Sequence, residues 1–144
     1  MKIDIRTGPW SEQQAAAQAI RYAVFVIEQN IPAELEWDDM DAVCLHALAF
    51  DEMGVSMGTG RLLPDGHIGR MAVKKSARGS GVGGAILDAL VDAAVARGDK
   101  LVMLNAQAAA ERFYAAHGFT RDGSEFMEAG IPHIGMRREL DSSK

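Results

Sequence analysis

The sequence is poor in cysteine, in long apolar runs and, over much of its length, in positive charge. Its single cysteine, Cys44, cannot form an internal disulfide, so the 144-residue chain must be stabilised by its apolar core. No stretch reaches the roughly 18 consecutive apolar residues that a membrane-spanning helix needs. The N-terminus also lacks the apolar run after a basic start that marks a signal peptide. We therefore expect a cytoplasmic protein that makes no contact with a membrane.

The charge balance excludes a general affinity for nucleic acid, which requires clustered Lys and Arg. The chain has 15 Lys and Arg against 20 Asp and Glu, a formal net charge of -5. Residues 22–60 contain acidic residues but no Lys or Arg, whereas residues 66–87 contain Lys and Arg but no acidic residue. Two adjoining blocks of opposite sign are compatible with chance variation on a solvated surface or with two sites of opposite charge.

The apolar pattern predicts one domain over residues 1–144 with alternating strands and helices. We expect strands near residues 3–5, 44–50, 55–63, 68–73, 101–104, 119–127 and 133–140, and helices near residues 11–27, 85–97 and 108–117. Residues 101–104 show no polar alternation, which is typical of a strand covered on both faces. The expected fold class is α/β (α+β), a mixed, mainly antiparallel sheet in the order β-α-β-β-β-α-β-α-β-β with helices on both faces.

The most informative segment is Arg78-Gly79-Ser80-Gly81-Val82-Gly83-Gly84, between an expected strand and an expected helix. Glycines let backbone N–H groups turn toward one point, where the helix N-terminus adds partial positive charge. Phosphate oxygens are the natural ligands of such a loop, and Arg78 supplies a cation beside them. A turn that needs glycine only for its positive φ angles is the alternative.

Three classes of phosphate ligand use glycine loops of this kind. A nucleoside triphosphate loop ends in Gly-Lys-Ser or Gly-Lys-Thr, whereas Gly84 is followed by Ala85-Ile86. A dinucleotide loop starts close behind its strand, and the next strand ends in an acidic residue. Here residues 74–78 intervene, and the next strand ends in Leu104-Asn105. An acyl-CoA site is the remaining class.

Two segments, in this order, carry a family resemblance. Residues 78–83 follow the strand 68–73, and residues 110–119 contain a Phe-Tyr pair before Gly-Phe. These segments resemble the Q/R-x-x-G-x-G/A motif and the second signature of the GNAT superfamily of acyl-CoA-dependent N-acetyltransferases. Residues 25–30 and 130–133 further resemble its small bacterial ElaA-like branch. The matching order of elements extends the resemblance over nearly the whole chain.

The resemblance implies acetyl-CoA as the cofactor. Backbone N–H groups of residues 78–83 would hold the pyrophosphate, and the edge of strand 71–73 would pair with the pantetheine amides like a further strand. The cofactor arm would enter a gap beside the strand that ends at Asn105, whose side chain either binds the arm or caps a helix. The expected cofactor residues are Met71, Ala72, Val73, Arg78, Gly79, Ser80, Gly81, Val82, Gly83, Asn105 and Phe113.

The resemblance also assigns Tyr114 as the proton donor to the departing thiolate; the alternative is an aromatic ring that packs on the sheet. The incoming amine must lose a proton. A base or a chain of water molecules must take it. The candidates are His46, Glu28 and the acidic loop residues Glu34, Glu36 and Asp38. A lone strand histidine such as His46 is more often a core residue, and His67 and His133 at strand starts are weaker candidates. The acidic block would face a cationic acceptor. The expected acceptor residues are Glu28, Glu34, Glu36 and Trp37. The Trp37 ring would either form a cation–π contact with the acceptor or pack within the loop.

The expected function is transfer of an acetyl group from acetyl-CoA to a primary amine of a small, cationic acceptor, by direct attack on the thioester and without a metal. A non-catalytic module that binds acyl-CoA or a partner protein is the alternative. Tyr114 and the intact glycine loop argue against it. Edges of the final strands could pair in a homodimer.

Overall fold

The computed structural model describes residues 2–36 and 38–140. Its strands are β1 (Asp4–Pro9), β2 (Leu45–Phe50), β3 (Ser56–Leu62), β4 (Ile68–Val73), β5 (Leu101–Gln107), β6 (Thr120–Glu128) and β7 (Ile131–Glu139). Its α-helices are α1 (Trp10–Arg21), α2 (Ala33–Glu36), α3 (Val82–Arg97) and α4 (Glu111–Ala116). Apart from the single turn of α2, the order of strands and helices is the one predicted from the sequence.

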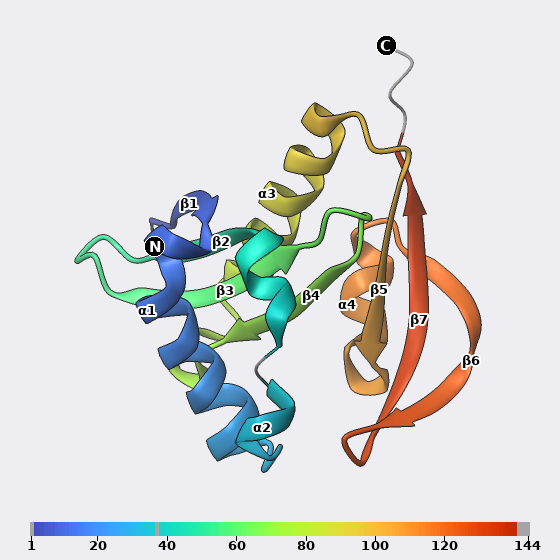
Figure 1. The fold of residues 1–144 in the computed structure, drawn as a ribbon, viewed down its shortest axis with the longest axis horizontal. Helices are drawn as coiled ribbons and strands as arrows, with labels where there is room; N and C mark the ends of the chain where they lie inside the picture. The colour runs from blue at the N-terminus through green and yellow to red at the C-terminus, as the bar shows by residue number, and fades with distance from the viewer. Residues whose placement is uncertain (1, 37, 141–144) are drawn as a thin grey trace.

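The strands form two antiparallel sheets, with the orders β1-β2-β3-β4 and β5-β7-β6. The sheets meet where β4 and β5 begin, at a parallel bridge between His67 and Met103, and the Met103 N–H donates to the Gly66 carbonyl at 3.1 Å. Beyond this point β4 and β5 diverge (Figure 1). The mainly antiparallel character is confirmed, and the division into two sheets separates the far ends of β4 and β5.

Helices α1 and α3 cover opposite faces of the first sheet. Ile20 of α1 packs in one apolar cluster with Leu48 of β2, whereas Ile86 of α3 packs in another with Ala47 and Ala49. The two clusters share β2 because successive strand residues point to opposite faces. No helix within residues 2–36 and 38–140 is both long and apolar enough to cross a membrane.

The burial of residues along strand β5 differs from the pattern expected from the sequence. Val102, Leu104 and Ala106 are buried, but Asn105 between them is exposed. Leu101 and Met103 on the other face are half-buried, so the prediction of a strand covered on both faces holds in part for residues 101–104, and exposure begins at Asn105. The four apolar residues 101–104 were too short a sample to reveal the alternation, which becomes visible only because the strand continues to Gln107.

The first long helix changes its winding along its length. After α1 the chain continues as a π-helical segment, Tyr22–Glu28, and the Gln29 and Ile31 N–H groups donate to the Val24 and Phe25 carbonyls at 3.1 and 2.9 Å. The wider turn carries the end of this segment to two distant parts of the chain. Glu28 meets the glycine loop, and Gln29 accepts a hydrogen bond from Gln107 at the end of β5.

Candidate active site

A cavity of about 470 Å³ lies where β4, the glycine loop and α4 meet. Its wall comprises Met71, Ala72, Val73, Ala77, Arg78, Gly79, Gly81, Val82, Gly83, Gly84, Ala110, Phe113 and Tyr114. Gly79 and Gly81 have φ angles of 79° and 88°, in the left-handed region that favours glycine. Gly81 is also the N-cap of α3, so the free N–H groups of the first helical turn lie at the loop.

The side of β4 that faces β5 is open beyond the bridge at His67. Strand β4 pairs with β3 along its other edge, where Val73 is opposite Gly58. Arg70 has a φ angle of 50°, and the register between β3 and β4 shifts opposite this point, which marks a β-bulge. An unpaired strand edge that leads to a glycine loop fits an acyl-CoA, with amides for the edge and phosphates for the loop.

Arg78, expected at the phosphates, is already engaged by a carboxylate. Its Nη1 and Nη2 donate to the two carboxylate oxygens of Glu28 at 2.6 and 2.7 Å, and its Nε donates to the Val73 carbonyl at 3.0 Å. The hydrogen bonds from Arg78 lower the pKa of the Glu28 carboxyl. Glu28, expected to bind the acceptor, thus lies at the entrance to the cofactor loop.

A second cavity, of about 310 Å³, lies on the other side of the same junction. About half of the residues in its wall have polar side chains, among them Gln29, Glu36, Arg61, His67, Arg70, Asn105, Gln107, Glu128 and His133. Met71, Ala110 and Tyr114 line both cavities. Molecules bound in the two cavities would therefore contact each other at these shared residues.

Tyr114 lies in α4 with its ring packed among aromatic neighbours. Phe113 and Phe119 meet it edge to face, with ring centroids at 5.0 and 6.0 Å. The residue is 9% exposed, and no described residue hydrogen-bonds its hydroxyl, which is open to the cavities rather than enclosed. Burial raises the pKa of Tyr114 to about 12, so the side chain is a protonated phenol at neutral pH.

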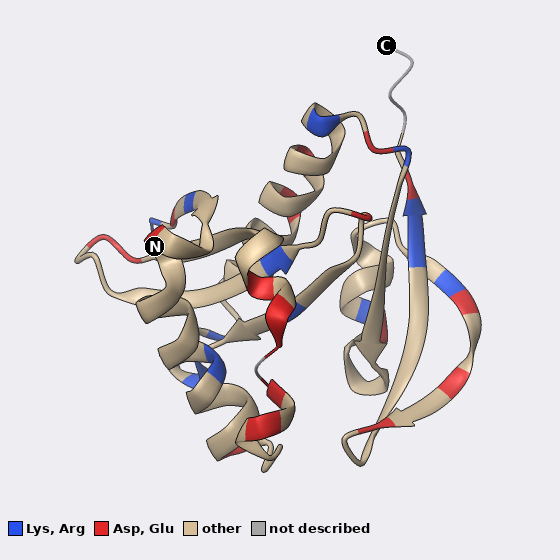
Figure 2. Ribbon diagram, viewed as in Figure 1, with Lys and Arg blue, Asp and Glu red and all other residues tan. Residues whose placement is uncertain are grey.

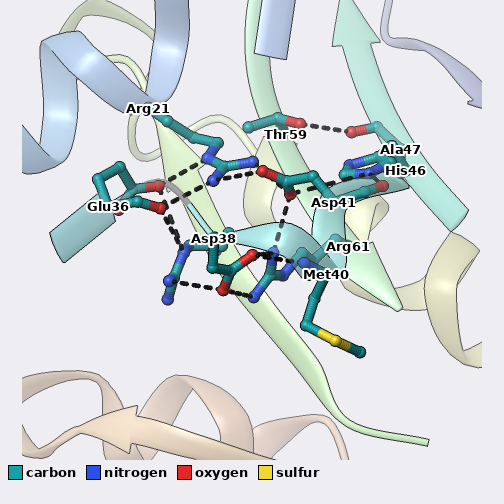
Figure 3. A network of polar contacts seen from close by, with 10 residues as sticks. Arg21, Glu36, Asp38, Met40, Asp41, His46, Ala47, Thr59 and Arg61 are labelled. Carbon is teal, nitrogen blue, oxygen red and sulfur yellow. Dashed lines mark hydrogen bonds and ion pairs between the residues drawn. The ribbon is translucent and has the colours of Figure 1, made fainter. Parts of the chain in front are cut away.

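The central carboxylates of residues 22–60 pair with arginines. Figure 2 shows where acidic and basic residues lie along the ribbon. Arg21 Nε donates to Glu36 Oε2 at 2.6 Å, and its Nη1 donates to Asp41 Oδ1 at 2.8 Å (Figure 3). Arg61 bridges Asp41 and Asp38, each at 2.8 Å, and holds the pKa of the Asp38 carboxyl at about 2.

Glu36, expected to bind the acceptor, is 3% exposed within this network. Burial raises its pKa, and the hydrogen bond from Arg21 opposes that change. Arg70 contributes a third guanidinium, whose Nη2 donates to Asp38 at 3.2 Å. Four of the eight carboxylates in residues 22–60 thus pair with arginines outside that range, namely Glu28, Glu36, Asp38 and Asp41. Glu36, Arg61 and Arg70 form part of the wall of the second cavity.

The structure brings most of the expected cofactor residues together. Except for Ser80 and Asn105 they line the first cavity. Ser80 lies in the loop and donates to the Ala77 carbonyl, while Asn105 lines the second cavity. Asn105 therefore lies apart from the other expected cofactor residues.

The residues expected on the acceptor side are scattered. His46 is 1% exposed, lies against the Trp10 ring at 4.6 Å, and its Nε2 is 2.9 Å from the Asp41 carbonyl oxygen. Burial lowers its pKa, and it lines neither cavity. Glu34 is exposed away from both cavities, and Trp37 lies outside the described residues.

His133, a weaker candidate base in the sequence, lies at the second cavity. It lines the second cavity together with Tyr114, although it was placed below His46 because it stands at the start of a strand. Its segment, Gly130-Ile131-Pro132-His133, did carry a signal, since it is part of the resemblance to the ElaA-like branch. The same cavity contains the hydrogen-bonded pair Gln29 and Gln107; Gln29 lies in the other segment of that resemblance, residues 25–30, whereas Gln107 had no signal in the sequence.

Comparisons with known proteins agree with this geometry. Residues 11–140 match the family model described as "Acetyltransferase (GNAT) domain". YjcF of Bacillus subtilis, named as an uncharacterized N-acetyltransferase, is 41% identical over 131 residues, which cover 89% of this chain and 94% of that protein. The crystal structure of Escherichia coli ElaA is 32% identical with a TM-score of 0.85, covering 96% of this chain and 100% of that one.

A third comparison points the same way. The crystal structure of an acyl-CoA N-acyltransferase from Pseudomonas aeruginosa is 32% identical with a TM-score of 0.84, and the match covers 95% of this chain and 99% of that one. The family resemblance predicted from the two motifs is confirmed, including the likeness to ElaA. The chain belongs to the GNAT family of acetyltransferases.

Proposed function

We propose that the protein transfers an acetyl group from acetyl-CoA to a primary amine of a small acceptor. The observation that carries the proposal is the wall shared by the two cavities, which contains Met71, Ala110 and Tyr114. The apolar cavity beside the glycine loop would hold the cofactor, and the polar cavity would hold the acceptor. Their junction brings the two reactants together without a covalent enzyme intermediate.

Each element of the first cavity has a physical role in this proposal. The cofactor supplies an activated thioester. The open edge of β4 from Met71 to Val73 orients the cofactor arm, and a backbone N–H near Val73 stabilises negative charge on the carbonyl oxygen. The first turn of α3 and the loop around Gly81 attract the phosphates.

Tyr114 supplies the proton donor. A free thiol has a pKa near 8.5, so a thiolate benefits from a donor as it departs. The raised pKa of Tyr114, about 12, keeps the phenol protonated until that charge develops. The same apolar surroundings disfavour a bare thiolate, which increases the value of the hydrogen bond.

The size of the second cavity and one carboxylate in its wall, unpaired among the described residues, support a small ammonium compound as the acceptor. Its volume of about 310 Å³ is at the lower end of the range for small-molecule sites. Two charged residues in its wall already have partners, because Glu36 accepts a hydrogen bond from Arg21, and Arg61 donates one to Asp41. Glu128 makes no hydrogen bond or ion pair with a described residue, so it is the carboxylate available to a cation.

The test is release of coenzyme A, detected with a thiol reagent, over a panel of polyamines, amino sugars, aminoglycosides and amino acids. We expect turnover with at least one amine, and a kcat about 10- to 1,000-fold lower for Tyr114→Phe with an unchanged affinity for coenzyme A. Phenylalanine keeps the ring packing and removes only the hydroxyl. Binding of coenzyme A without turnover of any amine would instead support the non-catalytic module.

A further inference from the structure

The proposed reaction leaves one proton without an acceptor. A primary amine is an ammonium ion at neutral pH and cannot attack until it loses a proton. The carboxylates expected near the acceptor are engaged elsewhere, because Glu36 is bonded to Arg21 and Glu28 to Arg78. His46 is enclosed against Trp10 and lines neither cavity. A base must therefore be sought on the wall of the second cavity itself.

His133 has the geometry of a base that faces this cavity. It is 7% exposed, and its Nδ1 lies 2.7 Å from the carbonyl oxygen of Ile131. A carbonyl oxygen only accepts hydrogen bonds, so Nδ1 carries the hydrogen and the neutral ring has its lone pair on Nε2. No described residue hydrogen-bonds Nε2, and this nitrogen is not among the fully enclosed polar atoms.

The ring of His133 is also held in orientation. The Phe126 ring of β6 stacks on it at a centroid distance of 5.8 Å and an angle of 25° between the planes. On the other side of β7, Gln107 of β5 is its cross-strand partner. The stacked Phe126 ring and the hydrogen bond at Nδ1 fix the orientation of the imidazole and therefore the direction of Nε2.

The titratable and charged groups around this cavity come from several elements. Strand β6 contributes Glu128, α4 contributes Tyr114, and the first sheet and α2 contribute His67, Arg70, Arg61 and Glu36. The polar residues that strand β5 contributes to the wall, Asn105 and Gln107, are uncharged. None of these groups is hydrogen-bonded to His133.

We propose that His133 is the catalytic base that deprotonates the acceptor amine, an inference that rests on the proposed acetyl transfer. The ammonium group gives one proton to Nε2, and the freed lone pair forms the C–N bond to the acyl carbon. The C–S bond breaks, and its electron pair passes to sulfur. The nitrogen loses its second proton as the sulfur gains one from the Tyr114 hydroxyl, and the phenol is restored by that second proton. His133 returns its proton to solvent.

The test compares wild type with His133→Asn, using an amine that the wild type acetylates. The asparagine amide N–H can keep the hydrogen bond to the Ile131 carbonyl but supplies no basic nitrogen. We expect kcat/KM for the amine at pH 7 to fall about 10²- to 10⁴-fold, with the KM for acetyl-CoA unchanged. We also expect the loss to shrink as the pH rises, because the amine then loses its proton to the solvent.

Hydroxylamine as the acceptor separates a chemical role from a structural one. It is mostly unprotonated at pH 7 and needs no base, so His133→Asn should acetylate it at close to the wild-type rate. Equal losses with hydroxylamine and with the ammonium acceptor would overturn the proposal, since a distorted site would impair both. Coenzyme A affinity measured by calorimetry on the same variant reports whether the cofactor side stays intact.

His67 is the competing base, because it lines the same cavity and its Nδ1 is 2.9 Å from Asp65. We expect His67→Asn to keep the wild-type ratio of kcat/KM for the ammonium acceptor to kcat/KM for hydroxylamine, and His133→Asn to lower that ratio. A lowered ratio in His67→Asn alone would overturn the assignment to His133 while leaving acetyl transfer in place. Absence of turnover in the wild type would overturn both.

Discussion

Replacement of Asp41 by asparagine tests whether the arginine network supports the acceptor side of the molecule. The Asp41 carboxylate accepts hydrogen bonds from Arg21 Nη1 and Nη2 at 2.8 and 3.1 Å and from Arg61 Nη1 at 2.8 Å. Asp41→Asn keeps the shape, removes one negative charge and turns an NH2 group toward guanidinium donors. Arg21 and Arg61 are 1% and 5% exposed, so water cannot compensate.

The expected magnitude follows from the burial of both partners. Removal of one partner from a buried ion pair destabilises a protein by about 3–5 kcal/mol, because it leaves an uncompensated charge. Arg21 retains Glu36 and Arg61 retains Asp38, which places the expected loss at the lower end, about 3 kcal/mol. For a domain of this size the melting temperature should then fall by about 6–12 °C.

The assay is urea unfolding followed by circular dichroism, together with a thermal melt. With a typical urea slope of about 2 kcal/mol/M, the midpoint should fall by about 1.5 M without a change in slope. Asp39→Asn is the matched control, because Asp39 lies in the same short 3₁₀ segment, is exposed and bonds to no described side chain. It should change stability by less than about 0.5 kcal/mol. Equal, small effects of the two substitutions would refute the reasoning.

Three further outcomes concern the site. Glu28→Gln removes the carboxylate from a half-exposed ion pair worth about 0.2–1 kcal/mol and so frees the Arg78 guanidinium for the phosphates. Calorimetry should then show coenzyme A binding about 2- to 5-fold tighter, and weaker binding would contradict this. Glu128→Gln should raise the acceptor KM about 2- to 10-fold in steady-state assays, whereas Glu34→Gln should not, and equal effects would remove Glu128 from the acceptor site. The pKa of Tyr114 is about 12, so ionisation of its phenol should not lower kcat until the pH exceeds 10. Any decline of kcat with rising pH that begins below pH 10 should therefore persist in Tyr114→Phe; its disappearance in this variant would show that the phenol ionises earlier.

The cofactor side of the site could be predicted because its information is local. Gly79 and Gly81 adopt positive φ angles within one loop, and the start of α3 follows directly in the chain. Phe113 and Tyr114 belong to one short segment whose spacing is a family signature. Such features depend on a few consecutive residues, so they are visible in the sequence without knowledge of the packing.

The acceptor side could not be predicted, because it depends on pairs far apart in the chain. Arg61 meets Asp38, and Gln107 meets Gln29, only after the sheets and the π-helical segment are in place. Charge counted along the sequence therefore indicated an acidic surface where the folded chain holds neutralised ion pairs. The direction of a strand side chain, into a cavity or into the core, depends likewise on register.

The sequence by itself determined the family, the order of elements and the loop that would hold phosphates, because periodicity and short motifs encode them. The tertiary structure alone decided which histidine is available for chemistry. His46 and His133 both stand on strands, but the first is enclosed beneath α1 and the second faces a cavity at the end of β5. The tertiary structure also decided that Arg21 and Arg61 pair with the buried carboxylates of residues 22–60, because an unpaired charge is strongly unfavourable in a buried position.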